Sequence, residues 1–188
     1  DPSSLLSYSV FEEHAVIVTK SGQLLGVGNN RDGRISSKLR KEKIKQFTQF
    51  VINDIDGSQL VPVSAVCTSF STLYLFTKSS GSGSQLVLCD SRINGGDPIF
   101  LNIGNHKPVS LFGGRFYTAA ICSEGEVIFI NYSSIKNSPN SLIESISLTE
   151  GMKAVSVAFC NKLVVVLSSN GRVFSSSIQS GSCVLNFK

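Results

Sequence analysis

Short apolar runs separated by turns that contain glycine recur along the whole chain. The clearest example begins at His14, where the apolar residues 15–18 lead to a turn at Gly22, a second apolar run at 24–27 and a polar loop at 29–33. Two apolar runs of about four residues on either side of such a turn are typical of a β-hairpin. Long helical patterns do not occur, so the sequence predicts an all-β protein.

Four such hairpins are predicted, at residues 16–25, 73–88, 119–129 and 164–174. Their turn glycines are Gly22, Gly83, Gly125 and Gly171, which lie 61, 42 and 46 residues apart. These intervals are close to the ~40 to 50 residues of one β-propeller blade. The first interval is longer, and we interpret the charged tract at 38–45 as an insertion between the first two units. The pair Asn170-Gly171 predicts a two-residue type I′ turn, because both residues tolerate a positive φ.

An additional apolar run precedes three of the hairpins, at residues 60–66, 107–112 and 152–158, and each run contains a Val-Ser step. Each unit therefore has at least three strands. The run at 164–167 is apolar at successive positions, so we expect both faces of that strand to be covered, as between neighbouring blades. The predicted fold is a partial β-propeller of about four blades. We expect one domain over residues 1–188, with repeats at about 1–50, 51–104, 105–150 and 151–188.

The composition is that of a folded globular protein, with 41% apolar and 16% charged residues. The formal net charge of +4 comes mostly from residues 38–45, which hold five of the 17 basic residues. No apolar stretch approaches the ~20 residues of a membrane-spanning helix, so no membrane span is expected. The five cysteines are widely spaced, and several lie in apolar runs. This favours reduced, buried thiols in a cytosolic or nuclear protein over a zinc site or a disulfide framework.

Catalytic, cofactor-binding and metal-binding residues are not predicted. The Gly-Val-Gly at 26–28 begins like a phosphate-binding loop, but Arg31 stands where the next glycine is required. The acidic run at 53–57 resembles a calcium loop but lacks the flanking ligand residues. The histidines, His14 and His106, are not accompanied by a nucleophilic serine motif. We therefore expect turn geometry at the first two places, no cofactor, and no enzyme activity.

In the first unit, His14, the turn glycine Gly22 and the loop Gly28-x-Asn30-x-x-Gly33 form one pattern. It resembles the repeat of the regulator-of-chromosome-condensation family, which runs through a Gly-x-x-His step, an apolar strand ending in Thr, a glycine turn and an Asn-x-x-Gly loop. The resemblance covers all four units in outline and is most specific in the first. The third unit keeps the first glycine of the pattern but has tyrosine in place of histidine.

Members of that family typically close seven blades into a ring, whereas this chain supplies four units. Three interpretations stay open: a segment of a longer chain, which we favour, a smaller ring, or pairing of two chains. The resemblance implies that His14 is structural and forms its hydrogen bond within its own blade. The residues with a structural role implied by the resemblance or the repeat pattern are His14, Gly22, Gly28, Asn30, Gly33, Gly114, Gly125 and Gly171.

The expected function is that of a protein-protein interaction module, a scaffold without catalytic residues. Guanine-nucleotide exchange on a small GTPase, which is the activity of the family's founding member, is the alternative. The expected partner contacts are Lys38, Arg40, Lys41, Lys43 and Lys45. The competing interpretation of these residues is a solvated loop or a charged edge strand. Attachment to nucleic acid or chromatin through the same residues is a third hypothesis.

Overall fold

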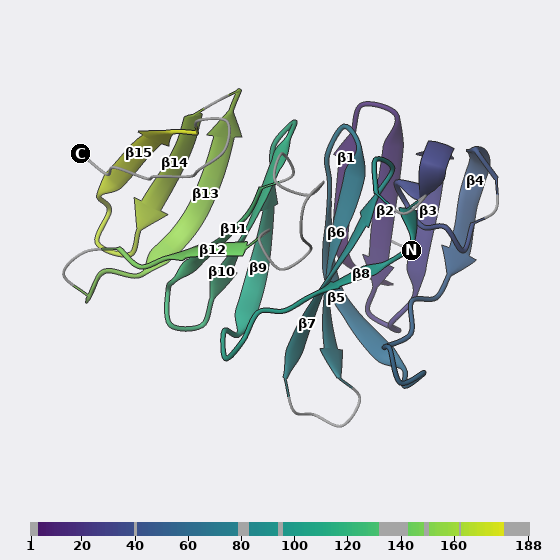
Figure 1. Ribbon diagram of the computed structural model, residues 1–188, viewed down its shortest axis with the longest axis horizontal. Helices are drawn as coiled ribbons and strands as arrows, with labels where there is room; N and C mark the ends of the chain where they lie inside the picture. The colour runs from purple at the N-terminus through teal and green to yellow at the C-terminus, as the bar shows by residue number, and fades with distance from the viewer. Residues whose placement is uncertain are drawn as a thin grey trace. The chain divides into compact units, whose positions relative to one another are not determined.

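The protein forms four antiparallel β-sheets (Figure 1). The computed structural model describes residues 4–39, 41–78, 83–93, 96–131, 143–148, 151–161 and 163–178. In every sheet each strand pairs with the next strand along the chain, which is the up-and-down order of a propeller blade. The predictions of an all-β fold and of four repeated units are confirmed. The chain divides into two compact units, Asp1–Leu101 with the first two sheets and Asn102–Lys188 with the last two.

The first sheet contains β1 (Leu5–Phe11), β2 (His14–Thr19), β3 (Leu24–Asn29) and β4 (Lys43–Phe50), with the short 3-10 helix η2 (Arg31–Gly33) between β3 and β4. The second sheet contains β5 (Leu60–Cys67), β6 (Ser71–Lys78), β7 (Ser84–Asp90) and β8 (Ile99–Leu101). The third contains β9 (Pro108–Gly113), β10 (Tyr117–Cys122), β11 (Val127–Asn131) and β12 (Ile143–Ile146). The fourth contains β13 (Ala154–Cys160), β14 (Leu163–Ser168) and β15 (Val173–Ser177).

Three of the central hairpin turns share the same backbone hydrogen bonds. In the first sheet Thr19 N donates to Gln23 O and Gly22 N donates to Thr19 O, both at 3.0 Å. The same pair of bonds begins at Cys122 in the third sheet and at Ser168 in the fourth. The turn glycines have the left-handed φ values of 77°, 87° and 83° that glycine adopts without strain. Backbone geometry therefore repeats where the side chains differ.

The turn at Gly171 is not the predicted type I′ turn. A type I′ turn needs a positive φ at both central residues, and among the two only Gly171 has one. The bonds from Ser168 N to Arg172 O and from Gly171 N to Ser168 O are typical of a three-residue loop that ends in a left-handed glycine. Asn170 contributes through its side chain instead, since its Oδ1 accepts a hydrogen bond from Ser168 Oγ at 2.6 Å.

Each unit has its own apolar core between its two sheets. In the first unit Val16 and Val18 of β2 share a buried cluster with Tyr74 and Phe76 of β6. In the second unit Phe159 of β13 lies with its ring centroid 6.3 Å from Tyr117 and 6.2 Å from Phe129. Aromatic pairs at such separations add to the stability gained by burying apolar area.

The expectation that both faces of residues 164–167 are covered is wrong. Val164 and Val166 are buried, but Leu167 is 36% exposed and Val173 of the paired strand is 61% exposed. Apolar residues at successive positions can mean that both faces of a strand are buried. The same pattern also occurs when one face is buried and the apolar side chains of the other face are exposed to solvent. The first arrangement occurs in β6, where residues 71–76 are all buried. A second exposed apolar row, Leu6, Tyr8 and Val10, lies on β1.

The charged tract at 38–45 does not lie between the first two units. It joins β3 to β4 inside the first sheet, and Lys43 and Lys45 are already part of β4. The tract takes part in the strand pairing of this sheet, since Ile44 pairs with Gly28. Thr48 pairs with Gly26, so residues 45–47 form a bulge opposite Val27. The terminal strand of the sheet therefore begins within the tract.

The cysteines only partly follow the expectation of buried thiols. Cys67, Cys89 and Cys122 are buried, Cys160 is exposed, and Cys183 lies outside the described residues. Burial raises the pKa of Cys67 to about 11, so this thiol is protonated and unreactive at neutral pH. The described segments contain no helix that is long and apolar enough to cross a membrane.

Gly28 is required both for its conformation and for its lack of a side chain. Its φ is +104°, and a Cβ atom would overlap the carbonyl oxygen of Glu13, in the turn just before the paired strand β2. Gly83 has a φ of +103° but no atom near the position of a Cβ. The two glycines therefore separate the conformational cost of a side chain from its steric cost.

We expect Gly83→Ala to lower the free energy of unfolding by about 1 kcal/mol, the typical cost of forcing alanine into a left-handed conformation. Gly28→Ala should cost a further ~1 to 3 kcal/mol, because the methyl group displaces β2 from β3. Urea denaturation followed by circular dichroism measures both. Equal losses in the two variants would show that the close approach at Glu13 does not constrain residue 28.

Candidate functional site

The loop between β3 and β4 is organised by one buried side chain, that of Asn30. Its Oδ1 accepts hydrogen bonds from Ile35 N at 2.9 Å and Ser36 N at 3.0 Å. Its Nδ2 donates to the carbonyl oxygens of Ser36, Leu39 and Lys41, at 3.0, 2.6 and 3.3 Å. A single amide thus provides partners for backbone groups of Ile35, Ser36, Leu39 and Lys41. Its bonds to Ile35 and Ser36 are buried, where such bonds are most costly to lose.

The same loop is anchored to the second sheet, within the first unit. Tyr74 donates its hydroxyl hydrogen to the carbonyl oxygen of Ile35 at 2.7 Å, and Thr72 Oγ1 donates to Arg34 O at 2.9 Å. In return, Arg34 Nη1 donates to Ser69 O at 3.0 Å. Ile35 is fully buried in the shared core. The loop is therefore fixed at both its backbone and its side chains, and its outer surface has a defined shape.

That outer surface carries the predicted partner contacts. A hollow of about 290 Å³ is lined by Lys38, Leu39, Lys41, Ile44 and Thr48. Ile44 belongs to the apolar core of the unit and the partly buried Leu39 packs against it, whereas the two lysines are exposed. The result is an apolar floor with positive charge at its rim. We call these five residues the basic hollow.

The other predicted partner contacts, Arg40, Lys43 and Lys45, do not line the basic hollow among the described residues. Lys43 and Lys45 are exposed on β4, whose place at the end of the strand order makes it an edge strand. Arg40 lies outside the described residues. Exposed lysines on an edge strand also discourage pairing with other chains, so part of the tract fits the competing interpretation of a charged edge.

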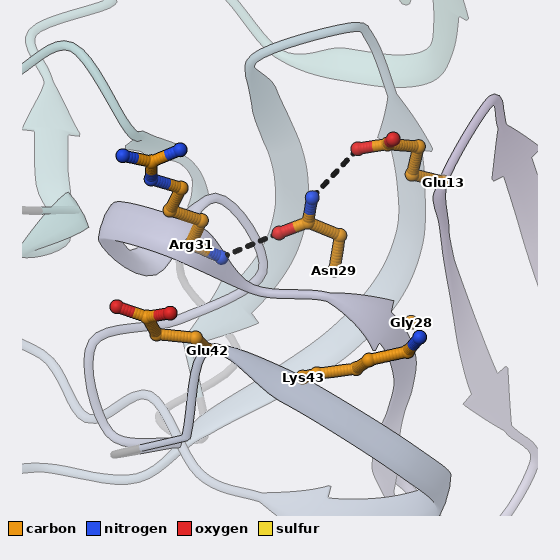
Figure 2. A pocket seen from close by; sticks show the side chains of 6 residues that line it. All are labelled: Glu13, Gly28, Asn29, Arg31, Glu42 and Lys43. Carbon is orange, nitrogen blue, oxygen red and sulfur yellow. Dashed lines mark hydrogen bonds between the residues drawn. The ribbon is translucent and has the colours of Figure 1, made fainter.

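A second hollow, of about 370 Å³, lies nearby in the same unit and is lined by Glu13, Gly28, Asn29, Arg31, Glu42 and Lys43 (Figure 2). Asn29 Nδ2 donates to Glu13 Oε2 at 2.6 Å, and its Oδ1 accepts from Arg31 N at 2.8 Å. The lining contains two carboxylates and two cationic side chains, so the hollow does not favour a ligand of either charge. Its bonded amide and carboxylate serve to fix the start of the Asn30 loop.

His14 lies behind this surface and connects the two sheets of the first unit. It is 3% exposed, and its Nε2 lies 3.2 Å from Thr72 Oγ1 of β6. The Thr72 hydroxyl donates its hydrogen to Arg34 O, so it accepts the hydrogen of Nε2. The hydrogen bond expected within one blade is therefore made to the neighbouring sheet. A structural residue of the first sheet thus also orders the second sheet, within the same unit.

The environment of His14 disfavours its charged form. Burial, followed by the positive charge of Arg34, lowers the pKa of His14 from 6.5 to about 4. The imidazole is therefore neutral at pH 7. A neutral, hydrogen-bonded side chain with no exposed face has a structural task and does not present itself to a substrate.

The remaining motif glycines fit close approaches and turns. Gly33 has a φ of 75°, and a Cβ on Gly96 would overlap its backbone. Gly114 does not have a positive φ, but a Cβ there would overlap that of Phe159. At the former calcium-loop candidate, Asp54 pairs with Lys78 at 3.0 Å and the Asp56 carboxylate accepts Ser58 N at 2.8 Å. These carboxylates are used within a polar turn.

One group of chemically versatile side chains was not found from the sequence. His106, Cys122 and Glu126 lie together in the second unit, with one potential ligand atom of each within 4.8 Å of the others. Their spacing of 16 and four residues matches no common metal motif. One sequence feature could have indicated this group: Cys122 occupies the turn position that holds Thr19 in the first hairpin and Ser168 in the fourth.

No protein-family model matches the chain, and no curated protein matches it in sequence. Solved structures match it in fold. The structure of human WBSCR16 superposes with a TM-score of 0.72 over 92% of this chain and 49% of WBSCR16, at 13% identity. Prp20p of Saccharomyces cerevisiae superposes with a TM-score of 0.63 over 96% of this chain and 49% of Prp20p, at 14% identity. The chain spans about half the length of each.

Yeast RCC1 (Prp20) bound to Kap60 gives a similar result, with a TM-score of 0.63 over 94% of this chain and 45% of that one, at 15% identity. The structural neighbours of the chain thus include proteins related to RCC1. At these identities the likeness establishes the fold alone, which is a partial β-propeller of four blade-like sheets.

The pKa of His14 makes the stability of the protein depend on pH. Below about pH 6.5 the unfolded chain binds a proton at His14 that the folded chain does not bind until about pH 4. Stability contributed by this residue is therefore complete above about pH 6.5 and is lost as the pH falls. By pH 5 we expect a loss of about 2 kcal/mol.

Urea denaturation at about pH 7.5 and about pH 5 tests this expectation in three proteins. The His14→Gln variant should lose about 2 kcal/mol less than the wild type between the two pH values, because it lacks the titrating group. His106→Gln retains His14 and serves as the control. If His14→Gln and the wild type show the same pH dependence, His14 is not the residue responsible.

Proposed function

We propose that the protein is a protein-interaction module whose basic hollow binds an acidic segment of a partner protein, with no chemistry of its own. The observation that carries the proposal is the combination of an apolar floor, Leu39 and Ile44, with the exposed lysines Lys38 and Lys41 on a loop held by a buried amide. An apolar side chain of the partner would enter the hollow while neighbouring carboxylates contact the lysines.

The internal hydrogen bonds of the loop support a binding role over a merely solvated one. A lysine loop that is merely solvated does not need hydrogen bonds to a buried side chain. Here the carbonyl groups of Leu39 and Lys41 accept hydrogen bonds from Asn30 Nδ2. A surface that is already ordered before binding avoids much of the conformational entropy that association would otherwise cost. Lysines at the rim would increase the association rate and select for negative charge.

The known partners of the structural neighbours are of the expected class. The yeast Prp20p structure was described together with its binding properties to Gsp1p and histones, and a further structure contains it bound to Kap60. These are protein partners, and they motivate the search for one here. They do not indicate which protein would bind this chain.

We expect Lys38→Glu/Lys41→Glu to weaken binding of fluorescein-labelled acidic peptides with one central leucine or phenylalanine by about tenfold or more, because two attractive charges become repulsive. Fluorescence anisotropy measures the dissociation constants. Lys20→Glu/Lys107→Glu makes the same change in net charge at exposed lysines elsewhere and should change them less than about twofold. Equal effects of the two double variants, or the absence of saturable binding, would contradict the basic hollow as the site.

Guanine-nucleotide exchange on a small GTPase is the second candidate, favoured by the likeness to Prp20p in fold. Exchange depends on a surface that stabilises the nucleotide-free GTPase and does not require a catalytic side chain. Release of a fluorescent guanine nucleotide from Ran-type and Rab-type GTPases measures it directly. We expect no acceleration at micromolar protein. An acceleration that Lys38→Glu/Lys41→Glu abolishes would replace the scaffold proposal by the exchange activity.

A further inference from the structure

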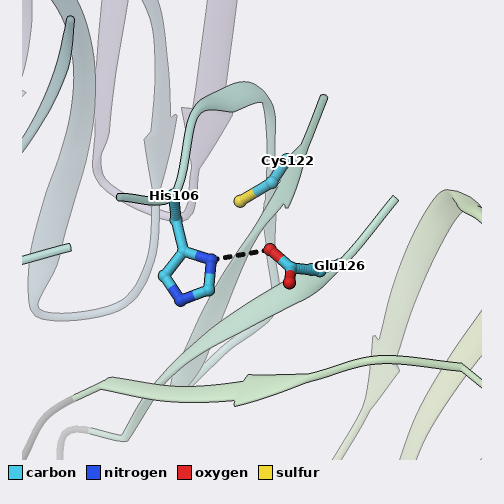
Figure 3. Close-up of side chains that lie close together, drawn as sticks. All are labelled: His106, Cys122 and Glu126. Carbon is cyan, nitrogen blue, oxygen red and sulfur yellow. Dashed lines mark hydrogen bonds and ion pairs between the residues drawn. The ribbon is translucent and has the colours of Figure 1, made fainter. Parts of the chain in front are cut away.

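His106, Cys122 and Glu126 converge in the second unit, the first from the loop before β9 and the other two from the hairpin of β10 and β11 (Figure 3). His106 Nδ1 lies 2.6 Å from Glu126 Oε2, and the Cys122 side chain points toward the same space. Cys122 is buried, whereas the side chains of His106 and Glu126 are 29% and 32% exposed. The group is thus closed on its sulfur side and open to water on the other.

The backbone fixes the three residues in place. Cys122 ends β10, and its amide donates to the carbonyl oxygen of Glu126 at 2.9 Å across the hairpin turn. The amide of His106 donates to Ile103 O at 3.1 Å, in the loop before β9. Ligands held on such turns need little rearrangement to meet an ion, which lowers the entropy cost of binding.

The corresponding turn position holds Thr19 in the first sheet and Ser168 in the fourth. There the hydroxyl groups support the turn, because Thr19 Oγ1 accepts from Gln23 N, and Ser168 Oγ shares its one hydrogen between Asn170 Oδ1 and Arg172 O. A thiol is a weak substitute in such hydrogen bonds. Cysteine at this position together with histidine and glutamate adds a set of donor atoms that the other two turns lack.

We propose that His106, Cys122 and Glu126 form a binding site for a divalent transition-metal ion of the Zn²⁺ class, with a water molecule as the remaining ligand. One thiolate, one imidazole and one carboxylate are ligand types that zinc accepts, and the sulfur and nitrogen donors select against Mg²⁺ and Ca²⁺. Three protein ligands with a solvent-facing side leave the fourth tetrahedral position open.

The distances allow this coordination after small side-chain rotations. Donor atoms on tetrahedral zinc lie about 3.3 to 3.8 Å apart, given bonds of about 2.0 to 2.3 Å. All three potential donor atoms already lie within 4.8 Å of one another. The ion would replace the hydrogen bond between His106 and Glu126, so these two side chains would separate by roughly 0.7 Å while the sulfur draws closer.

Metal binding would release the thiol proton, because a metal–sulfur bond forms as the sulfur–hydrogen bond breaks and the proton passes to water. Because a thiol must lose its proton before it binds a metal ion, the apparent affinity should rise with pH.

The test is a titration of the reduced full chain with Co²⁺ near neutral pH, followed by competition with Zn²⁺. We expect saturation at one equivalent, with a thiolate-to-cobalt charge-transfer band in the near ultraviolet that Zn²⁺ removes. Cys122→Ser should lose this band, and its Zn²⁺ affinity, measured against a chromophoric chelator, should fall more than about 100-fold. Serine stands at this turn position in the fourth sheet, so the variant should fold, which circular dichroism verifies.

Cys160→Ser and Cys183→Ser are the matched controls and should keep both the band and the affinity. His106→Gln and Glu126→Gln retain the sulfur and should each weaken Zn²⁺ binding at least about tenfold. Persistence of the band in Cys122→Ser would overturn the proposal, as would an affinity unaffected by both ring and carboxylate substitutions. The absence of saturable Co²⁺ binding to the wild type would overturn it as well.

Discussion

The amide of Asn30 is the interaction on which the surface of the first unit depends. It supplies hydrogen-bond partners to backbone groups between Ile35 and Lys41 that no strand can reach. Because the hydrogen bonds of those backbone groups are made within the protein, Leu39 can pack against the core while Lys38 and Lys41 are exposed to solvent. A buried polar group with all its partners in place defines one conformation, since any alternative leaves several bonds unmade at once. Fold and binding surface thus share one determinant.

The two sites proposed here illustrate how a repeated scaffold acquires separate properties. In the first unit an excursion between two strands is packed down and becomes a surface of defined charge. In the second unit the turn geometry is unchanged, and a cysteine at a turn position that holds a hydroxyl residue in the first and fourth sheets brings new chemistry. Neither change disturbs the strand order. The properties therefore depend on a few side chains, as is usual when one fold serves many functions.

The features that follow from local rules were predictable, and those that depend on partners far along the chain were not. Gly22, Gly125 and Gly171 marked hairpins because the left-handed conformation favours glycine. The strand beginning at Lys43 was only one of the interpretations left open for the charged tract, because its charged residues carry no apolar alternation. The inter-sheet bond of His14 to Thr72 spans 58 residues, and no local pattern encodes it. The meeting of His106 with Cys122 depends likewise on how a loop returns to a hairpin.

The hairpin turns have a consequence for how widely the sequence can vary on this fold. Their shared hydrogen bonds join main-chain atoms. The turn keeps its glycine, but the residue at its first position is Thr19, Cys122 or Ser168. Such a turn leaves most neighbouring residues free to vary. Units with little sequence in common can therefore share one shape, as can this chain and proteins only 13 to 15% identical to it.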